Sequence, residues 1–228
     1  MNPGDGRRIR ALLFDFDGMI LDTESPAYRS WQEVYREHGH DLTLADWSAA
    51  VGTLGGFDAL AHLEMLTGRA LDRDGIRSQR LLRKDRLVAD EAVRPGVLEY
   101  LAGAERLGLV VAIVSSDSRD WIEGNLARIG VGEGWAGIFC ADHDRARAKP
   151  APTLYLEALT ALGLEPSQAV AMEDSPNGIR AAKGAGLFCV AVPNPVTAGM
   201  DLGQADLVVA SLADLPLEEL LAKASAGG

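Results

Sequence analysis

The sequence predicts an α/β fold in which a parallel sheet forms the core and a helical domain is inserted into it. Six short apolar runs recur along the 228 residues, and from about residue 90 onward such runs alternate with helical segments. A stretch of about 70 residues without a strand-like run follows the first of them. Apolar runs without polar alternation are typical of strands buried on both faces. Strands that alternate with helices form parallel sheets.

Five of the six predicted strands end at polar or turn-forming residues. The strands cover residues 9–14, 109–114, 137–141, 169–172, 187–192 and, more weakly, 207–209. The residues that follow the first five are Asp15, Ser115-Ser116, Asp142, Glu173-Asp174 and Pro193-Asn194. Ligands of open parallel sheets bind outside the carboxyl ends of the strands, so these residues mark the edge where a site is expected.

Helical segments with clear start and stop signals lie between the later strands. They begin after Pro95-Gly96, at Ser118, after Pro150 and at Ser175-Pro176, and they end at Gly108, Gly130, Gly163 and near Gly184. A capping serine followed by proline at the first helical position is typical of a helix start. Together with the strands, these helices predict a Rossmann-like core with helices on both faces of the sheet.

The helical insert follows the first strand directly. Its expected helices cover residues 25–38, 46–51, 57–66 and 72–89, with a glycine-rich loop at residues 52–56. We therefore predict a discontinuous catalytic core made of residues 1–19 and 90–228, and a helical cap made of residues 20–89. The small residues of the tail, 222–228, are expected to fray.

Composition and charge restrict the class of protein. The formal net charge is −11 and 47% of the residues are hydrophobic. An acidic chain is not expected to bind nucleic acid or an anionic membrane through its overall charge. No apolar run approaches the ~20 residues of a membrane span, and the N-terminus lacks the apolar core of a signal peptide. Cys140 and Cys189 lie in apolar runs and are expected to be reduced. We expect a cytoplasmic monomer.

The polar residues at the predicted strand ends suit phosphate chemistry. They are Asp15, Asp17, Ser115, Glu173 and Asp174, and Lys149 comes from a separate loop. Four acids at one edge repel each other, and a divalent cation relieves that repulsion. Carboxylate oxygens combined with a phosphate are suited to Mg²⁺. A metal, a lysine and a hydroxyl together form a site for a phosphoryl group.

Each of these features also has a simpler interpretation when it is taken alone. Asp15 and Asp17 can be turn residues, and Ser115-Ser116 is a common way to enter a helix. The segment 173–176 can serve as a helix cap, and Lys149 can be a solvated surface charge. The presence of all of them in this order, each at a strand end or in a loop, favours the site.

Four segments resemble the motifs of the haloacid dehalogenase superfamily. They are "DFDGMILDTE", "IVSSDS", "AKPAPTLYLEAL" and "MEDSPNGIRAAKGAG". Their spacing matches that of the superfamily motifs, and the resemblance covers nearly the whole chain. The insert resembles the C1-type helical cap, and the subgroup to which the chain is most similar is that of the β-phosphoglucomutase-like sugar phosphatases and mutases. Dehalogenases of this superfamily resemble the chain but lack the second aspartate, so Asp17 favours phosphate esters.

The resemblance implies a role for each motif residue. Asp15 would attack phosphorus and become an aspartyl phosphate, and Asp17 would protonate the leaving oxygen and later activate water. The phosphoryl oxygens would be held by Ser115, Ser116 and Lys149. The metal ligands would be Asp15, Asp174 and the carbonyl of Asp17, with Glu173 in or just beyond that shell. Gly18 would let the chain turn so that both aspartates reach one phosphorus.

Three functions remain open at this stage. A Mg²⁺-dependent phosphatase of a small phosphorylated metabolite competes with a phosphomutase, and a binding or regulatory protein on an inactive scaffold is a third candidate. Hydrolysis is favoured because Ala27 and the region of Gly55 stand where a mutase of this subgroup carries a histidine and an arginine. The basic residues of the last insert helix are interpreted as a solvated face, with the alternative that one of them reaches the substrate. They are Arg77, Arg80, Arg83, Lys84 and Arg86.

Overall fold

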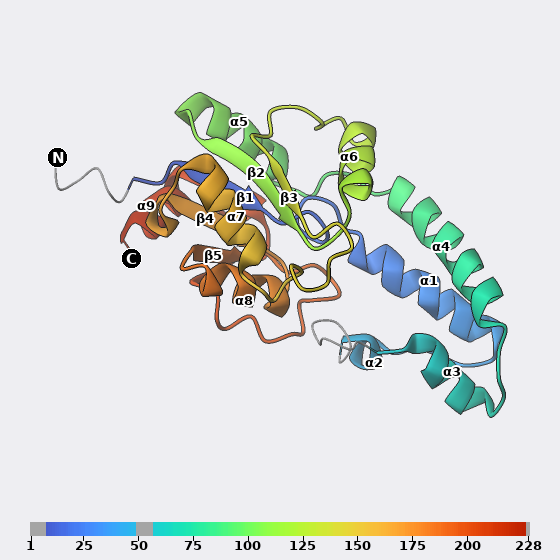
Figure 1. Ribbon diagram of the computed structural model, residues 1–228. Helices are drawn as coiled ribbons and strands as arrows, with labels where there is room; N and C mark the ends of the chain where they lie inside the picture. The colour runs from blue at the N-terminus through green and yellow to red at the C-terminus, as the bar shows by residue number, and fades with distance from the viewer. Residues whose placement is uncertain (1–7, 49–56, 227–228) are drawn as a thin grey trace.

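The computed structural model describes residues 8–48 and 57–226 (Figure 1). Its sheet contains six parallel strands in the order β3-β2-β1-β4-β5-β6. The strands are β1 (Ala11–Phe14), β2 (Val110–Ser115), β3 (Ile138–Cys140), β4 (Ala169–Glu173), β5 (Phe188–Ala191) and β6 (Leu207–Val208). The predicted α/β class, the parallel sheet and all six strands are confirmed, with strand ends that differ by one or two residues.

The central strand carries the first predicted aspartate. β1 pairs with β2 on one side and with β4 on the other, and Phe14 lies opposite Ile113 and Met172. Asp15 follows Phe14, and its backbone N–H donates to the Met172 carbonyl at 2.9 Å. Because all strands are parallel, the residues that follow β1, β2 and β4 meet at one edge of the sheet.

The two faces of the sheet bury different side chains. Along β1, Leu12 and Phe14 belong to one hydrophobic cluster, whereas Ala11 and Leu13 belong to another. The first face is covered by α5 (Val97–Leu107), α6 (Arg119–Arg128) and α9 (Leu217–Ala226), and the second by α7 (Thr153–Leu162) and α8 (Pro176–Gly184) (Figure 1). The second face carries several alanines, which allow a helix to approach closely.

The helices of the core begin where the sequence indicated. Ser118 accepts from the Trp121 N–H at the start of α6, and Ser175 accepts from the Gly178 N–H at the start of α8. The expectation of a frayed tail is wrong as far as Ala226, because α9 continues to that residue. Ala224 is buried against the core and anchors the last turn of this helix.

The helical insert stands away from the sheet in Figure 1. It consists of α1 (Glu24–Glu37), α2 (Leu44–Ser48), α3 (Ala59–Thr67) and α4 (Arg73–Ala89), and α1 packs along α4. A separate hydrophobic cluster around Tyr35 and Leu63 holds it together. Asp58 and Asp72 cap α3 and α4 with their side chains. The predicted end of the second helix and the loop at 52–56 lie outside the described residues, and the division at residues 20 and 89 stays a prediction.

Two expectations about the whole chain can be compared with the structure. Cys140 and Cys189 are free and buried, as predicted. Within the part of the chain that the structure describes, no helix combines the length and the apolar character needed to cross a bilayer.

Candidate active site

A cavity of about 400 Å³ opens at the carboxyl edge of the sheet. The sequence-predicted residues that line it are Asp15, Asp17, Ser115, Ser116, Lys149 and Asp174. Glu173 lies beneath this surface and is fully buried at the end of β4. The structure therefore brings the predicted side chains together from four segments of the chain.

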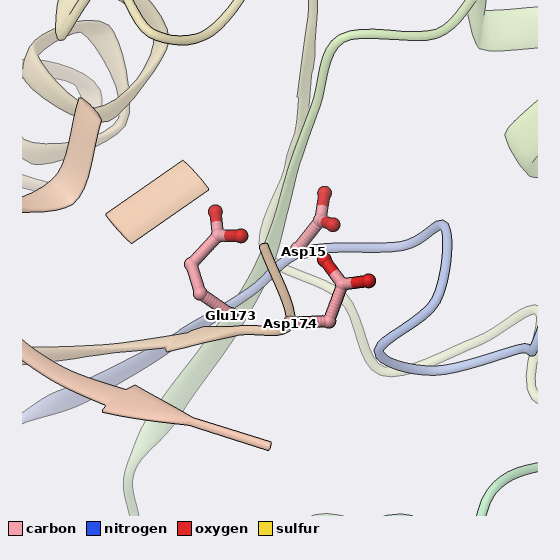
Figure 2. Close-up of side chains that lie close together, drawn as sticks. All are labelled: Asp15, Glu173 and Asp174. Carbon is pink, nitrogen blue, oxygen red and sulfur yellow. The ribbon is translucent and has the colours of Figure 1, made fainter. Parts of the chain in front are cut away.

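Three carboxylates lie close together at this edge of the sheet (Figure 2). Asp15, Glu173 and Asp174 each place an oxygen atom within 4.8 Å of the others. Their exposed fractions are 6%, 0% and 2%. Like charges packed this closely and away from water are unfavourable unless a cation or a proton compensates them.

Lys149 compensates two of these carboxylates. Its Nζ lies 2.5 Å from Asp15 Oδ1 and 2.7 Å from Glu173 Oε1. The Tyr155 hydroxyl of α7 donates to the same Glu173 oxygen at 2.5 Å. Burial alone would lower the pKa of the Lys149 ammonium, but the two carboxylates raise it above its ordinary value. Lys149 is therefore a cation of the buried site and not a solvated surface charge.

Unlike Asp15 and Glu173, Asp174 has a neutral side chain as its hydrogen-bond partner. Asp174 Oδ2 accepts a hydrogen bond of 2.6 Å from the side-chain amide of Asn194, which follows β5. Burial raises the pKa of Asp174 well above its ordinary value, and the charges of Asp15 and Glu173 raise it further. Burial likewise raises the pKa of Asp15 to about 7, with Lys149 opposing the rise and Glu173 adding to it.

The donor set fits a hard divalent cation. Three buried carboxylates face one buried ammonium, so the cluster carries more negative than positive charge when it is ionised. Glu173 Oε2 is buried without a hydrogen-bond partner among the described residues. Oxygen ligands of this kind are the ones that Mg²⁺ and Ca²⁺ prefer. The buried acidic cluster is therefore suited to bind a metal ion.

Gly18 makes room for this cluster. Its backbone has a φ of +79°, and a Cβ atom there would lie 2.1 Å from Asp174 Oδ2 and 2.6 Å from the Asn194 amide nitrogen. Only glycine satisfies both the backbone conformation and the close approach. The carbonyl of Gly18 accepts from the Arg94 guanidinium, which also donates to the carbonyls of Val192 and Pro193. The turn is thus fixed to the loop after β5.

Asp17 lines the same cavity but has hydrogen-bond partners of its own. Its Oδ1 accepts from the Thr23 hydroxyl at 2.8 Å and from the Trp121 indole N–H at 2.9 Å. Its Oδ2 lies 3.4 Å from Ser115 Oγ. Burial raises the pKa of Asp17 to about 6, and the charges of Asp117 and Asp15 add to the rise. The group can therefore carry a proton near neutral pH.

The two predicted serines differ in their contacts. Ser115 is buried, and its Oγ accepts from the Asp117 N–H at 3.0 Å. Ser116 Oγ accepts from the Lys149 N–H at 3.0 Å and thereby ties the β2 loop to the lysine loop. Ser116 thus makes a structural contact in addition to lining the cavity.

Several lining residues had been given no role at the site from the sequence. Thr23, Glu24 and Ala27 come from the start of the insert, and Lys84 reaches the cavity from α4. Burial raises the pKa of Glu24 to about 7, and the charge of Asp17 adds to the rise. Lys84 had been grouped with the basic face of its helix, but no local signal distinguished it from its neighbours. Ala27 stands at the position where a mutase of this subgroup carries a histidine, and it brings no charged side chain to the cavity.

Two other basic residues of α4 are engaged within the insert. Arg80 donates to Ser30 Oγ at 3.0 Å and lies over the Trp31 ring. Arg83 forms an ion pair of 2.5 Å with Glu37. These contacts explain why these two residues are not among those that line the cavity.

Comparison with known proteins agrees with this fold. A haloacid dehalogenase-like hydrolase family model matches residues 9–186. A Bacillus subtilis relative named "Putative phosphatase YhcW" is 41% identical over 93% of this chain and 96% of its own. Validoxylamine A 7'-phosphate phosphatase of Streptomyces hygroscopicus is 30% identical over 90% and 95%. The structure of CbbY from Rhodobacter sphaeroides in complex with xylulose-(1,5)bisphosphate has a TM-score of 0.73 and 32% identity, and covers 93% of this chain and 99% of that one.

The chain has an α/β fold with an acidic, lysine-bearing cavity at the carboxyl edge of its parallel sheet. The chain belongs to the haloacid dehalogenase-like hydrolases. Within that family, its relatives that are named as phosphatases identify it as a phosphoric monoester hydrolase. The family predicted from the four motifs is confirmed.

Proposed function

We propose that the chain is a Mg²⁺-dependent phosphatase that hydrolyses a small sugar phosphate through an aspartyl phosphate on Asp15. The observation that supports this most directly is the position of Asp15. It follows the central strand, lines the cavity and lies 2.5 Å from the Lys149 ammonium. A carboxylate beside a fixed cation can receive a phosphoryl group whose negative charge it would otherwise repel.

In the first step, an oxygen of Asp15 attacks phosphorus and the bond from phosphorus to the leaving oxygen breaks. The proton of the Asp17 carboxyl passes to that leaving oxygen, so the product departs as an alcohol. Ser115, Ser116 and Lys149 hold the phosphoryl oxygens during the transfer. The raised pKa of Asp17, about 6, is suited to a group that must carry a proton at the start of the cycle.

In the second step, the Asp17 carboxylate takes a proton from a water molecule. The oxygen of that water attacks the phosphorus of the aspartyl phosphate, and the bond from phosphorus to the Asp15 oxygen breaks. Inorganic phosphate leaves, Asp15 regains its carboxylate, and Asp17 is protonated again for the next cycle. One residue thus acts as acid and then as base.

The metal would be held by Asp15, Asp174 and the Asp17 carbonyl, with Glu173 beside them. When bound, Mg²⁺ supplies positive charge that offsets the charge on the phosphoryl group. Asn194 orients Asp174, and Tyr155 together with Lys149 orients Glu173. We also propose that the helical insert serves as a cap, because Glu24, Ala27 and Lys84 of the insert line the cavity.

The leaving group is proposed to be a neutral, hydroxyl-rich sugar. Glu24 and Asp117 line the cavity and can accept hydrogen bonds from hydroxyl groups. The Asp117 carboxylate disfavours a second phosphate on the substrate, which a mutase has to accommodate. The sequence of residues 49–56 contains no lysine or arginine that could bind a second phosphate. Ala27 cannot bind a phosphate through a charged side chain. CbbY binds xylulose-(1,5)bisphosphate, which supports a sugar phosphate as the class of substrate. The proposed substrate of this chain differs in carrying one phosphate instead of two.

The proposal is tested with a panel of sugar phosphates, nucleotides and small phosphorylated acids, with and without Mg²⁺. Release of phosphate from several hexose or pentose phosphates, only when Mg²⁺ is present, supports it. A second assay supplies β-glucose 1-phosphate with a trace of the 1,6-bisphosphate. Accumulation of glucose 6-phosphate faster than free phosphate would establish the phosphomutase alternative instead. Absence of turnover with every ester would favour a binding protein.

A further inference from the structure

Trp121 connects the helical insert to the catalytic cavity. It lies in the first turn of α6, and its indole N–H donates to Asp17 Oδ1 at 2.9 Å. The Nζ atom of Lys84, on α4 of the insert, lies 4.1 Å from the centre of the indole ring. One side chain of the core therefore contacts both an acid of the site and a lysine of the insert.

The two contacts suit the charge distribution of an indole. The face of an aromatic ring is negative and its N–H edge is positive. An ammonium over the face and a carboxyl oxygen at the N–H are therefore both favourable, and a cation–π contact of this kind contributes about 0.5–2 kcal/mol. Because Lys84 and Asp17 both line the cavity, the indole spans from the insert to the reacting groups.

The hydrogen bonds of Asp17 decide which of its oxygens carries the proton. An indole N–H can only donate, and the Thr23 hydroxyl also donates to Oδ1. Oδ1 therefore acts as an acceptor twice. Oδ2 has one longer hydrogen bond, of 3.4 Å, from the Ser115 hydroxyl, a group that can also accept. The proton of the neutral carboxyl is therefore placed on Oδ2.

We propose that Trp121 is a positioning residue for the acid–base step. Its N–H holds Oδ1 of Asp17, so that Oδ2 is the oxygen that delivers the proton to the leaving oxygen. Its ring contacts Lys84 and thereby aligns the insert with the acid. The inference rests on the proposed role of Asp17 as general acid.

The test is Trp121→Phe, which keeps an aromatic face for Lys84 but removes the N–H. Two substrates are compared: a sugar phosphate that the parent hydrolyses and p-nitrophenyl phosphate. For the sugar phosphate, kcat/KM should fall about ten- to hundredfold, the range for a lost hydrogen bond to a charged group. For p-nitrophenyl phosphate it should stay close to the parent value, because p-nitrophenolate leaves without being protonated.

Trp135→Phe is the matched control. The Trp135 indole N–H donates to the Val131 carbonyl at 2.8 Å, so this substitution also removes an indole hydrogen bond. Trp135 is not among the residues that line the cavity. This variant should keep both kcat/KM values. Equal losses on both substrates in Trp121→Phe, or no loss on either, would overturn the inference. A parent chain that hydrolyses neither ester would overturn the proposed function and this inference together.

A second variant tests the contact between the Lys84 ammonium and the Trp121 ring. Trp121→Leu removes the ring as well as the N–H, so KM should rise for both substrates in addition to the loss seen in Trp121→Phe. Identical kinetics in the two variants would show that the ring does not align the insert, and would overturn that half of the proposal.

Discussion

The Lys149 ammonium lies 2.5 Å from Asp15 Oδ1, although 134 positions separate the two residues in the sequence. Both side chains are buried. The same ammonium lies 2.7 Å from Glu173. This three-residue contact joins the end of β4 and the residue after β1 to the lysine loop.

Asp15→Asn should abolish turnover while the fold is retained. The amide has nearly the same shape as the carboxyl group, but it is not a nucleophile toward phosphorus. Phosphate release from the best substrate of the panel measures the loss, and circular dichroism checks the fold. Activity within about tenfold of the parent would contradict the role of Asp15.

Lys149→Met should lower kcat and raise KM for every phosphoester, whatever its leaving group. The methionine fills a similar volume but leaves Asp15 and Glu173 without their buried cation. Removing one partner of a buried ion pair costs about 3–5 kcal/mol, so the melting temperature should fall as well. Lys223→Met changes an exposed lysine that pairs with Glu219 and should alter neither quantity. A loss confined to one substrate would place Lys149 in the specificity pocket instead.

Asp174→Ala should weaken Mg²⁺ binding. A ligand that binds only the folded state raises its stability, so Mg²⁺ should raise the melting temperature of the parent but much less that of the variant. Without Mg²⁺ the variant should be as stable as the parent or more so, because burial and two neighbouring acids make the Asp174 charge unfavourable. Asp85→Ala, an exposed change, is the control. An unchanged Mg²⁺ effect would rule out Asp174 as a ligand.

Gly18→Ala should destabilise the chain and remove its response to Mg²⁺. The matched control is Gly39→Ala, because Gly39 has a φ of +78° and open space where its Cβ would lie. Both variants incur the cost of a left-handed non-glycine residue, about 1–2 kcal/mol. Only the change at Gly18 also forces its Cβ into Asp174 Oδ2. Equal unfolding free energies for the two variants would show that the close approach at Gly18 is unimportant.

The amino-acid sequence determined the architecture of the core and the identity of the acids. The apolar runs of the strands and the capping residues of the helices are local signals, so the ends of the six strands could be placed to within two residues, whereas helix α9 was not predicted. Asp15, Glu173 and Asp174 follow such runs directly, and Asp17 lies two residues beyond Asp15. Parallel strands bring their carboxyl ends together, and this alone predicts that the four acids meet.

The tertiary structure decided how these side chains are paired. That Glu173 binds Lys149 and Tyr155, and that Trp121 and Thr23 share one oxygen of Asp17, depends on distances between segments remote in sequence. Lys84 carries the same local pattern as the arginines beside it, yet it lies on the Trp121 ring and lines the cavity. Local patterns fix the conformation of a segment, whereas the contacts of a long side chain are fixed by the packing of other segments around it.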